Sequence, residues 1–277
     1  MKKIKILVVL YKESLGSSAT IDSLKKIFPA AYDKAEFELS IWDNSPAPQS
    51  EKEINIFKKN CSGLKWVNYH HDPMNSSLSH VYNQIISDAN ENDYFILLDQ
   101  DSLFDKNFIK EFLDVAEKHS PELILPVIKF KKVIVSPSKI NFIKGEYFNS
   151  APQGMIELKR LSAINSGMII SANYVQKNHF KYDVKLKNYC TDDYFMRVFR
   201  KKGKSVYVLN YVFEHELTLS TLNDNSEQLK ERYRSMKEGK YIVYSDTCIN
   251  RLAIRIYFFL HRFYMAFKYK DRDYLGL

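Results

Sequence analysis

Two carboxylates one residue apart end an apolar run near the middle of the chain. Residues 94 to 99 read Tyr-Phe-Ile-Leu-Leu-Asp, and Gln100 and Asp101 follow. A run of this kind suits a strand buried on both faces, so Asp99 and Asp101 would leave the sheet at its carboxyl edge, where open α/β sheets bind ligands. Alternate residues of an extended chain point the same way, so both carboxylates can converge on one hard cation. The alternative is a solvated turn after the strand.

Strand-like and helix-like segments alternate around these acids. In the first half of the chain, the patterns predict strands over 5–10, 37–42, 65–69 and 94–99, and helices over 18–28, 51–59, 75–89 and 106–118. Later strands are expected over 123–130, 133–135, 168–170 and 205–212, and a helix within 189–202. Repeated β–α alternation favours a mixed, mostly parallel sheet covered by helices. We therefore predict an α/β fold with a C-terminal helical appendage.

The composition fits a folded chain with a basic tail. Of 277 residues 45% are hydrophobic, and the net charge is +8. From Lys230 onward eleven Lys and Arg residues stand against five acids, so most of the positive charge belongs to the tail. The three cysteines (Cys61, Cys190 and Cys248) show no metal-like spacing and indicate a reducing compartment. No segment reaches the roughly 18 uncharged apolar residues of a membrane span, so we expect a cytoplasmic location.

The tail itself, residues 226–277, has apolar residues at helical spacing between Ile249 and Phe267, with Arg and Lys distributed around them. A basic amphipathic helix rich in Phe and Tyr suits the surface of an anionic membrane, which would place the protein peripherally on the inner face of the cell membrane. In the alternative, this helix packs on its own catalytic domain or on a second subunit, giving a homodimer.

The ordered motifs of residues 4 to 220 resemble the family 2 glycosyltransferases with the GT-A (nucleotide-diphospho-sugar transferase) fold. In chain order they are Ile6 to Tyr11, Trp42-Asp43-Asn44-Ser45, Asn75-x-x-Leu78-Ser79-x-x-x-Asn83, Asp99-Gln100-Asp101, Asn165-Ser166-Gly167, Thr191-Asp192 with Arg197 and Gly203, and His215. The bacterial rhamnosyltransferase-like branch is most similar, because Leu-Asp-Gln-Asp-Ser and the Asn-Ser-Gly turn are typical of it. The resemblance implies a catalytic domain over 1–225, with a nucleotide-binding half (1–102) and an acceptor half (103–225).

The resemblance also implies a donor site for a UDP- or dTDP-sugar. Asp101 would ligate Mg²⁺ or Mn²⁺, Asp99 would contact the ribose or a metal-bound water, and His215 would join the metal or diphosphate site. Other donor contacts would come from Tyr11, Asp43, Asn75, Ser79, Asn83 and Gln100, with Asp43 accepting from the base imide. The alternatives remain that Asp43 belongs to a plain turn, Tyr11 to the edge of the core, Asn75 to a helix cap and His215 to the surface.

Asp192 lies where the family places the general base of an inverting transfer. The family usually shows Glu-Asp here, whereas this chain has Thr191-Asp192-Asp193, so Asp193 is the alternate base. Both acids could instead only stabilise the start of a helix.

The function expected from the resemblance is an inverting, metal-dependent hexosyltransferase, specifically a rhamnosyltransferase, of bacterial surface polysaccharide synthesis. Its acceptor would be a saccharide, either free or linked to a lipid. A nucleotidyltransferase is the alternative enzyme, although Lys12-Glu13-Ser14-Leu15-Gly16 is a poor phosphate loop. A nucleic-acid-binding protein is the non-enzyme alternative. We expect no nucleic-acid partner, because the positive charge is confined to the tail and the predicted cleft is acidic.

Overall fold

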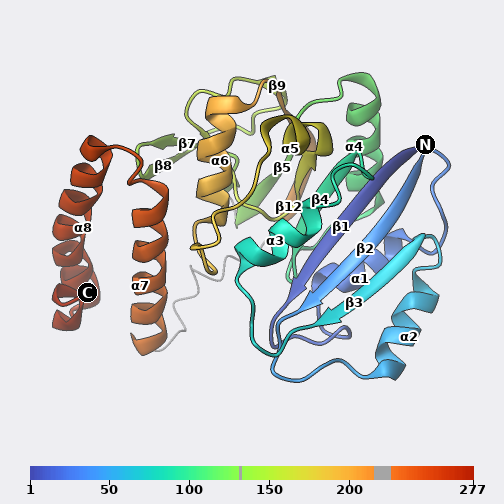
Figure 1. Cartoon of the computed structure of the whole chain (residues 1–277), viewed down its shortest axis with the longest axis horizontal. Helices are drawn as coiled ribbons and strands as arrows, with labels where there is room; N and C mark the ends of the chain where they lie inside the picture. The colour runs from blue at the N-terminus through green and yellow to red at the C-terminus, as the bar shows by residue number, and fades with distance from the viewer. Residues whose placement is uncertain (131–132, 215–225) are drawn as a thin grey trace.

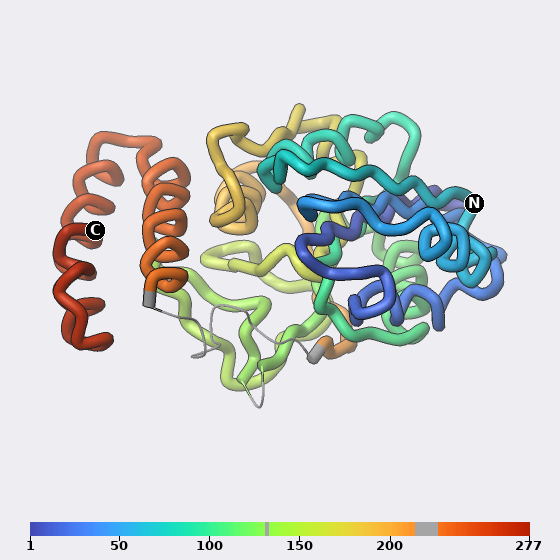
Figure 2. The backbone as a smooth tube through the Cα atoms, turned by 90° about the horizontal axis from the view of Figure 1, so that it is seen from below, coloured from blue at the N-terminus to red at the C-terminus, as the bar shows by residue number. Residues whose placement is uncertain are grey.

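A computed structural model of the chain describes residues 1–130, 133–214 and 226–277. The two termini lie at opposite ends of the molecule, with the C-terminal helices forming one end (Figures 1 and 2). The strands are β1 (Lys2–Leu10), β2 (Ala35–Asp43), β3 (Trp66–His71), β4 (Tyr94–Asp99), β5 (Leu123–Phe130), β6 (Val133–Ser136), β7 (Ser138–Asn141), β8 (Lys144–Tyr147), β9 (Gly154–Ile156), β10 (Leu161–Ser162), β11 (Met168–Ser171) and β12 (Val206–Glu214).

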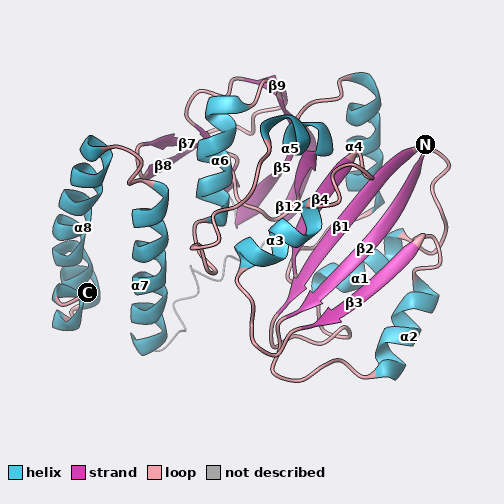
Figure 3. Ribbon diagram, in the orientation of Figure 1, coloured by secondary structure: helices cyan, strands magenta, loops and turns pink. Residues whose placement is uncertain are grey.

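The helices alternate with the strands in the first half of the chain and dominate its end (Figure 3). They are α1 (Ala19–Ile27), α2 (Glu51–Asn60), α3 (Leu78–Ile86), α4 (Lys106–Lys118), α5 (Ala172–Asn178), α6 (Thr191–Lys202), α7 (Ser226–Val243) and α8 (Cys248–Tyr269), followed by the 3₁₀ turn η2 (Arg272–Leu275). Serine side chains cap several of these helices. Ser18, Ser50 and Ser77 each accept a hydrogen bond from the third backbone amide beyond them, which fixes where α1, α2 and α3 begin.

Within the described ranges, the main sheet has the order β3-β2-β1-β4-β11-β5-β12-β9, with β6 paired to β5. The strands β3, β2, β1 and β4 are parallel, and β11 runs antiparallel between β4 and β5. β12 returns parallel to β5. A small antiparallel sheet, β10-β7-β8, lies beside it. The predicted α/β fold with a mostly parallel sheet is confirmed.

Two apolar layers bury the faces of this sheet. On one face, α1, α2 and α4 contribute Leu24, Phe57 and Phe112 to a core with the strands. On the other, α3, α5 and α6 contribute Tyr82, Tyr174, Phe195 and their neighbours. β4 is buried along its apolar run and becomes partly exposed at Asp99. Because parallel strands with both faces covered end at one edge, the polar residues after β1, β2 and β4 are brought together there.

The tail is a helical hairpin that packs on the α/β part of the chain. α7 lies beside α6, and α8 lies on the outer side of α7 (Figures 1 and 2). A third apolar cluster, which includes Tyr233, Tyr244, Ile254 and Phe258, joins α7 to α8 and also takes in Leu186. One face of α8 therefore packs on α7 of its own chain, and contact of the other face with a membrane or a second subunit stays a prediction.

No helix in the described part of the chain, α8 included, combines the length and the apolar character that a membrane crossing requires.

Candidate active site

The turn after β4 is fixed by the start of α1. The Thr20 amide and the Ser18 hydroxyl both donate to the carbonyl of Gln100, at 3.2 and 2.6 Å, and the Thr20 hydroxyl donates to the carbonyl of Asp99. The Ser102 amide donates back to the Thr20 hydroxyl at 2.9 Å. The backbone that carries Asp99 and Asp101 is thus held by side chains of another element, which is more than a plain solvated turn requires.

Gln100 connects two strand ends. Its side-chain oxygen accepts from the backbone amide of Tyr11, with the two atoms 2.7 Å apart, so the ends of β1 and β4 are tied together. The Tyr11 ring is 42% exposed and lies under the ammonium group of Lys12, 5.1 Å from the ring centre. An exposed ring at a strand end is available for stacking on a flat ligand.

The Asn165-Ser166-Gly167 turn brings two side chains to the edge of the sheet. Ser166 donates a hydrogen bond to the Asp99 carboxylate, and Asn165 donates to the hydroxyl of Thr191 at 2.9 Å. Gly167 has a φ of +74°, and a Cβ atom there would lie 2.7 Å from Pro126 and 2.8 Å from the Phe213 ring. Only glycine fits this turn, and the turn links Asp99 to the first residue of α6.

Asp192 and Asp193 lie side by side in the first turn of α6 but have different surroundings. Asp192 is half-buried, and its carboxylate accepts from the Asp193 amide at 2.8 Å. Burial, together with the charge of Asp193, raises the pKa of Asp192 to about 7. The Asp193 carboxylate lies 2.5 Å from the ammonium group of Lys240 on α7.

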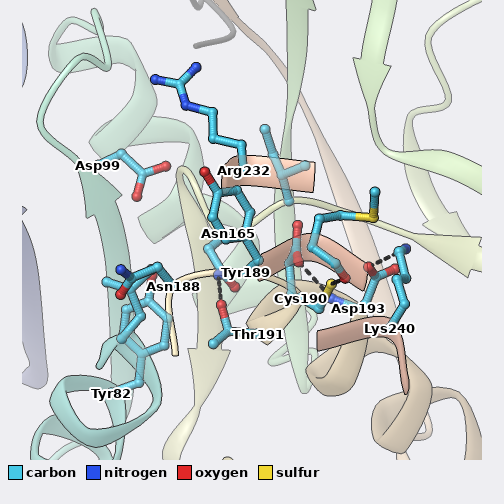
Figure 4. Close-up of a pocket in the computed structure, with 14 residues that line it drawn as sticks. Tyr82, Asp99, Asn165, Asn188, Tyr189, Cys190, Thr191, Asp193, Arg232 and Lys240 are labelled. Carbon is cyan, nitrogen blue, oxygen red and sulfur yellow. Dashed lines mark hydrogen bonds and ion pairs between the residues drawn. The ribbon is translucent and has the colours of Figure 1, made fainter. Parts of the chain in front are cut away.

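A cavity of about 500 Å³ joins these residues. Its polar lining includes Asp99, Asn165, Asp192, Asp193, Arg232 and Lys240. Figure 4 shows the Asp193–Lys240 ion pair on one side of the cavity and Asp99 on the other. Asp99 and Asp192 therefore face one common space of a size that suits a small-molecule substrate. Asp101 is not among its lining residues.

A second cavity of about 520 Å³ adjoins the first. It is lined by Tyr11 and Asn44 at the ends of β1 and β2, by Asn75, and by residues of α7. Asn75 has a φ of +53°, and the residue that caps α3 is Ser77, so the helix-cap alternative for Asn75 does not hold. Tyr11 and Asn75 thus line one cavity, and contact of either with a sugar donor stays a prediction.

Five other predicted donor residues line neither cavity: Asp43, Ser79, Asn83, Gln100 and Asp101. Asp43 is fully buried; its carboxylate accepts from the Ser45 amide at 3.0 Å, Gln49 at 2.9 Å and the Tyr69 hydroxyl at 2.7 Å. Burial alone would raise the pKa of Asp43, but these hydrogen bonds outweigh it and lower the pKa. The group is held ionised in the turn after β2, and base recognition by Asp43 stays a prediction.

Ser79 and Asn83 do not line either cavity. The Ser79 hydroxyl is buried and donates to the Leu186 carbonyl, while the Asn83 amide bonds both the carbonyl and the amide of Tyr182, at 2.9 and 2.8 Å. Both side chains tie α3 to the segment that leads into α6. Their geometry is that of positioning residues, in contrast to the donor contacts expected from the sequence.

The metal prediction depends on Asp99 and Asp101, because His215 lies outside the described residues. Among the described residues, no group of three or more His, Cys, Asp or Glu side chains is arranged to hold a metal ion. Two hard carboxylates one residue apart nevertheless fit Mg²⁺ or Mn²⁺, since such ions are commonly held by one or two carboxylates together with substrate phosphates. The donor set therefore fits an ion that shares its ligands with a bound diphosphate.

A family model described as "Glycosyl transferase family 2" matches residues 5–177, more than half of the chain. The chain belongs to glycosyl transferase family 2. This membership confirms the predicted family and favours a glycosyltransferase over the nucleotidyltransferase alternative. The matched region of this family 2 protein includes the strand ends that carry Tyr11 and Asp99, and it ends before α6.

Solved structures with the same fold include residues 1–349 of TarS from S. aureus. The TM-score is 0.57 at 16% identity, covering 99% of this chain and 89% of that one. The same TarS fragment in complex with UDP-GlcNAc gives 0.56 at 15% identity, covering 91% and 69%. GalNAc-T7 with UDP, GalNAc and Mn²⁺ gives 0.58 at 12% identity, covering 85% and 48%. The predicted GT-A fold is confirmed. A comparison with proteins of curated function found no match.

Sequence reasoning missed the part of the site that this family 2 glycosyltransferase takes from α7. Arg232, Met236 and Lys240 all line the first cavity. Their spacing of four residues places them on one face of a helix, and that periodicity was a usable signal. The sequence prediction for the tail rests on its more strongly apolar second helix and assigns no role to the polar face of α7.

Proposed function

We propose that this protein is an inverting, metal-dependent glycosyltransferase of bacterial surface polysaccharide synthesis. It moves a sugar from a UDP- or dTDP-sugar to a saccharide acceptor, and in the more specific form of the proposal that sugar is rhamnose. The observation that carries the proposal is the common cavity of Asp99 and Asp192, in which the pKa of Asp192 is raised to about 7. The UDP-bound TarS and GalNAc-T7 structures support a uridine nucleotide as donor.

In the proposed reaction, the Asp192 carboxylate accepts the proton of an acceptor hydroxyl. The hydroxyl oxygen forms a bond to the anomeric carbon while the bond from that carbon to the donor phosphate oxygen breaks, so the nucleoside diphosphate leaves with the electron pair. Attack opposite the leaving group inverts the anomeric centre. A carboxylate with a pKa near 7 is well matched to this task, because about half of it is ionised at neutral pH and the ionised form is basic enough to accept a proton.

Asp99 and Asp101 are the residues that would hold Mg²⁺ or Mn²⁺. When bound, the ion supplies positive charge that stabilises the departing diphosphate. Ser166 holds the Asp99 carboxylate by a hydrogen bond, and the start of α1 holds the backbone on either side of Gln100. The chain thus fixes the Asp99 carboxylate and the backbone that leads to Asp101 before a ligand arrives.

A thermal-shift screen tests the donor and the metal together. UDP, dTDP, GDP and ADP are each added with and without Mn²⁺, and a bound nucleotide raises the unfolding temperature by mass action. We expect UDP or dTDP to stabilise the protein in the presence of Mn²⁺ and Asp101→Asn to lose this effect. Asp114→Asn, an exposed acid on α4, is the matched control. Indifference to all four nucleotides would contradict the proposal.

We also propose that α8 places the enzyme on an anionic membrane surface, where a lipid-linked acceptor would be found. The outer face of α8 carries exposed apolar side chains over five turns: Ile249, Leu252, Ile256, Phe259, Leu260, Phe263, Tyr264 and Phe267. Arg251, Arg255, Lys268 and Lys270 lie exposed around them. The Arg262 guanidinium lies 4.3 Å from the centre of the Phe259 ring and 5.0 Å from that of Phe263. Aromatic side chains among basic ones complement anionic headgroups.

Vesicle co-sedimentation tests this surface. We expect binding to vesicles that contain phosphatidylglycerol, weaker binding to phosphatidylcholine alone, and loss of binding in Phe259→Gln/Phe263→Gln. Ile56→Gln, an exposed apolar residue on α2, is the control. Point substitutions are preferable to removal of the tail, because α7 lines the cavity that holds Asp192. If the protein does not bind vesicles but forms a dimer that the same substitutions disrupt, this face of α8 contacts a second subunit instead.

A further inference from the structure

The two cavities share one wall. Leu78, Asn188, Tyr189 and Arg232 line both of them, so the cavities form adjoining parts of one cleft and Arg232 lies at their boundary. In Figure 4 the guanidinium group of Arg232 is drawn above Asp99, on the side of the cavity away from the Asp193–Lys240 pair.

The two parts of the cleft differ in chemistry. The part with Asp99 and Asp192 carries the groups proposed for sugar transfer, whereas the part with Tyr11 and Asn75 has an exposed ring and a side-chain amide in its lining. A nucleotide sugar is linear, with its diphosphate between the nucleoside and the sugar. If the sugar lies beside Asp192 and the base beside Tyr11, the diphosphate crosses the boundary at Arg232. This step rests on the proposed function.

The charges along the cleft call for a cation at this boundary. Asp99, Asp192 and Glu231 line the cleft and would repel a diphosphate. Among the described residues that line the two cavities, Lys240 and Arg232 are the basic ones, and Arg232 is the one that lines both. A guanidinium group can donate two parallel hydrogen bonds to phosphate oxygens, which suits it to a diphosphate better than a single ammonium.

The helix that carries Arg232 is held close to the cleft. A Cβ atom on Gly239 would lie 3.0 Å from the Cys190 sulfur and from the Tyr189 carbonyl, so α7 packs tightly against the residues before α6. The Cys190 thiol also donates to the Met236 carbonyl at 3.6 Å. The Lys240–Asp193 ion pair adds a third connection. Arg232 is therefore presented from a fixed backbone, one to two turns before these contacts.

We propose that Arg232 binds the diphosphate of the sugar donor and of the departing nucleotide, so that α7 is a part of the donor site and more than an appendage. The family match ends at residue 177, well before this helix. The assignment thus concerns a residue that neither the family match nor the sequence motifs point to.

Isothermal titration with UDP and dTDP, combined with NMR titration of uridine and thymidine, tests the assignment. Whichever nucleoside diphosphate binds the wild-type protein, we expect Arg232→Gln to lower its affinity by about 10- to 100-fold, the size expected for charge-assisted hydrogen bonds. Nucleoside affinity should stay unchanged. Arg232→Lys, which keeps the charge but not the fork, should recover part of the loss. Arg234→Gln, an exposed arginine on the same helix, is the control and should bind like wild type.

Two results would overturn the assignment: unchanged diphosphate affinity in Arg232→Gln, or an equal loss of diphosphate and nucleoside affinity in a variant that unfolds at the wild-type temperature. A wild-type protein that binds neither diphosphate would instead refute the proposed function, and the role of Arg232 with it. If Arg232→Gln unfolds at a lower temperature than wild type, the diphosphate affinity of Arg232→Lys is the test of the assignment, because a lysine side chain is long enough to keep the packing of the helix.

Discussion

The Asp193 carboxylate lies 2.5 Å from the Lys240 ammonium group, and both side chains are about 15% exposed (15% and 14%). The pair joins the first turn of α6 to α7, and the Tyr244 hydroxyl donates to the same carboxylate at 3.4 Å. Burial alone would lower the pKa of Lys240, but the neighbouring carboxylate raises it, so the lysine stays charged. Asp193 therefore has a structural partner, while Asp192 faces the cavity with a pKa raised by burial. This division favours Asp192 over Asp193 as the base.

Replacing the base is the first test. Asp192→Asn keeps the size of the side chain and its ability to accept from the Asp193 amide but cannot take up a proton. We expect the rate of sugar transfer to fall by about 10²- to 10⁴-fold, the usual contribution of a general base, with nucleoside diphosphate affinity unchanged. Steady-state kinetics and calorimetry check the two parts. A variant with the wild-type kcat would exclude Asp192 as the base.

The pH dependence of the reaction provides a second test, because the base must be ionised. With a pKa of about 7 for Asp192, kcat/KM should fall about tenfold per pH unit below this value. Lys240→Met removes a positive charge that lowers the pKa of Asp192 and leaves the Asp193 charge that raises it, so the acid limb should move to higher pH.

The matched control for this test is the double variant Asp193→Asn/Lys240→Met. Lys240→Met alone leaves a largely buried carboxylate without its ion-pair partner, which costs about 3 kcal/mol of unfolding free energy. Neutralising Asp193 as well should return most of that stability and move the acid limb back toward lower pH. An acid limb that is the same in all three proteins would show that another group limits the rate.

The sequence predicts the strand ends of this site well and its final geometry poorly. The apolar run before Asp99 could be interpreted locally, because a strand buried on both faces leaves a continuous apolar pattern, and helix α4 falls on the predicted residues 106–118. The role of α7 depends on how a helix more than 120 residues further along the chain packs beside α6 and comes to line the same cavity as Asp99, and no local pattern encodes that arrangement. Ser79 and Asn83 show the same limit: polar residues at a helix start suggest ligand contacts, but their actual partners are backbone atoms of residues 182–186.

The stability of the protein should reflect the raised pKa of Asp192. In the unfolded chain this carboxyl group loses its proton near pH 4, whereas in the folded protein it keeps the proton until about pH 7. Between these values the folded state binds more protons, so the contribution of Asp192 to stability declines as pH rises from 4 to 7 and stays low above pH 7.

Asp192→Asn removes this decline. We expect the variant to be more stable than wild type at pH 8 by about 2 kcal/mol, less than the full shift implies because Asp192 retains some contact with solvent, and to differ little at pH 4. Urea unfolding at the two pH values measures this. Equal stability at pH 8 would mean that Asp192 ionises without penalty in the folded protein, contrary to the role of burial in its pKa.

Asn83 separates a positioning residue from a donor contact. Its amide makes two hydrogen bonds to the Tyr182 backbone, and Asn83→Ala would leave both backbone groups without that partner. We expect a loss of about 2 kcal/mol of unfolding free energy with little change in UDP affinity of the folded protein. Gln84→Ala, at the next and exposed position of α3, is the control and should have little effect on either quantity. A variant of Asn83 with wild-type stability but greatly weakened UDP binding would instead place this side chain in the donor site, as the sequence motif first suggested.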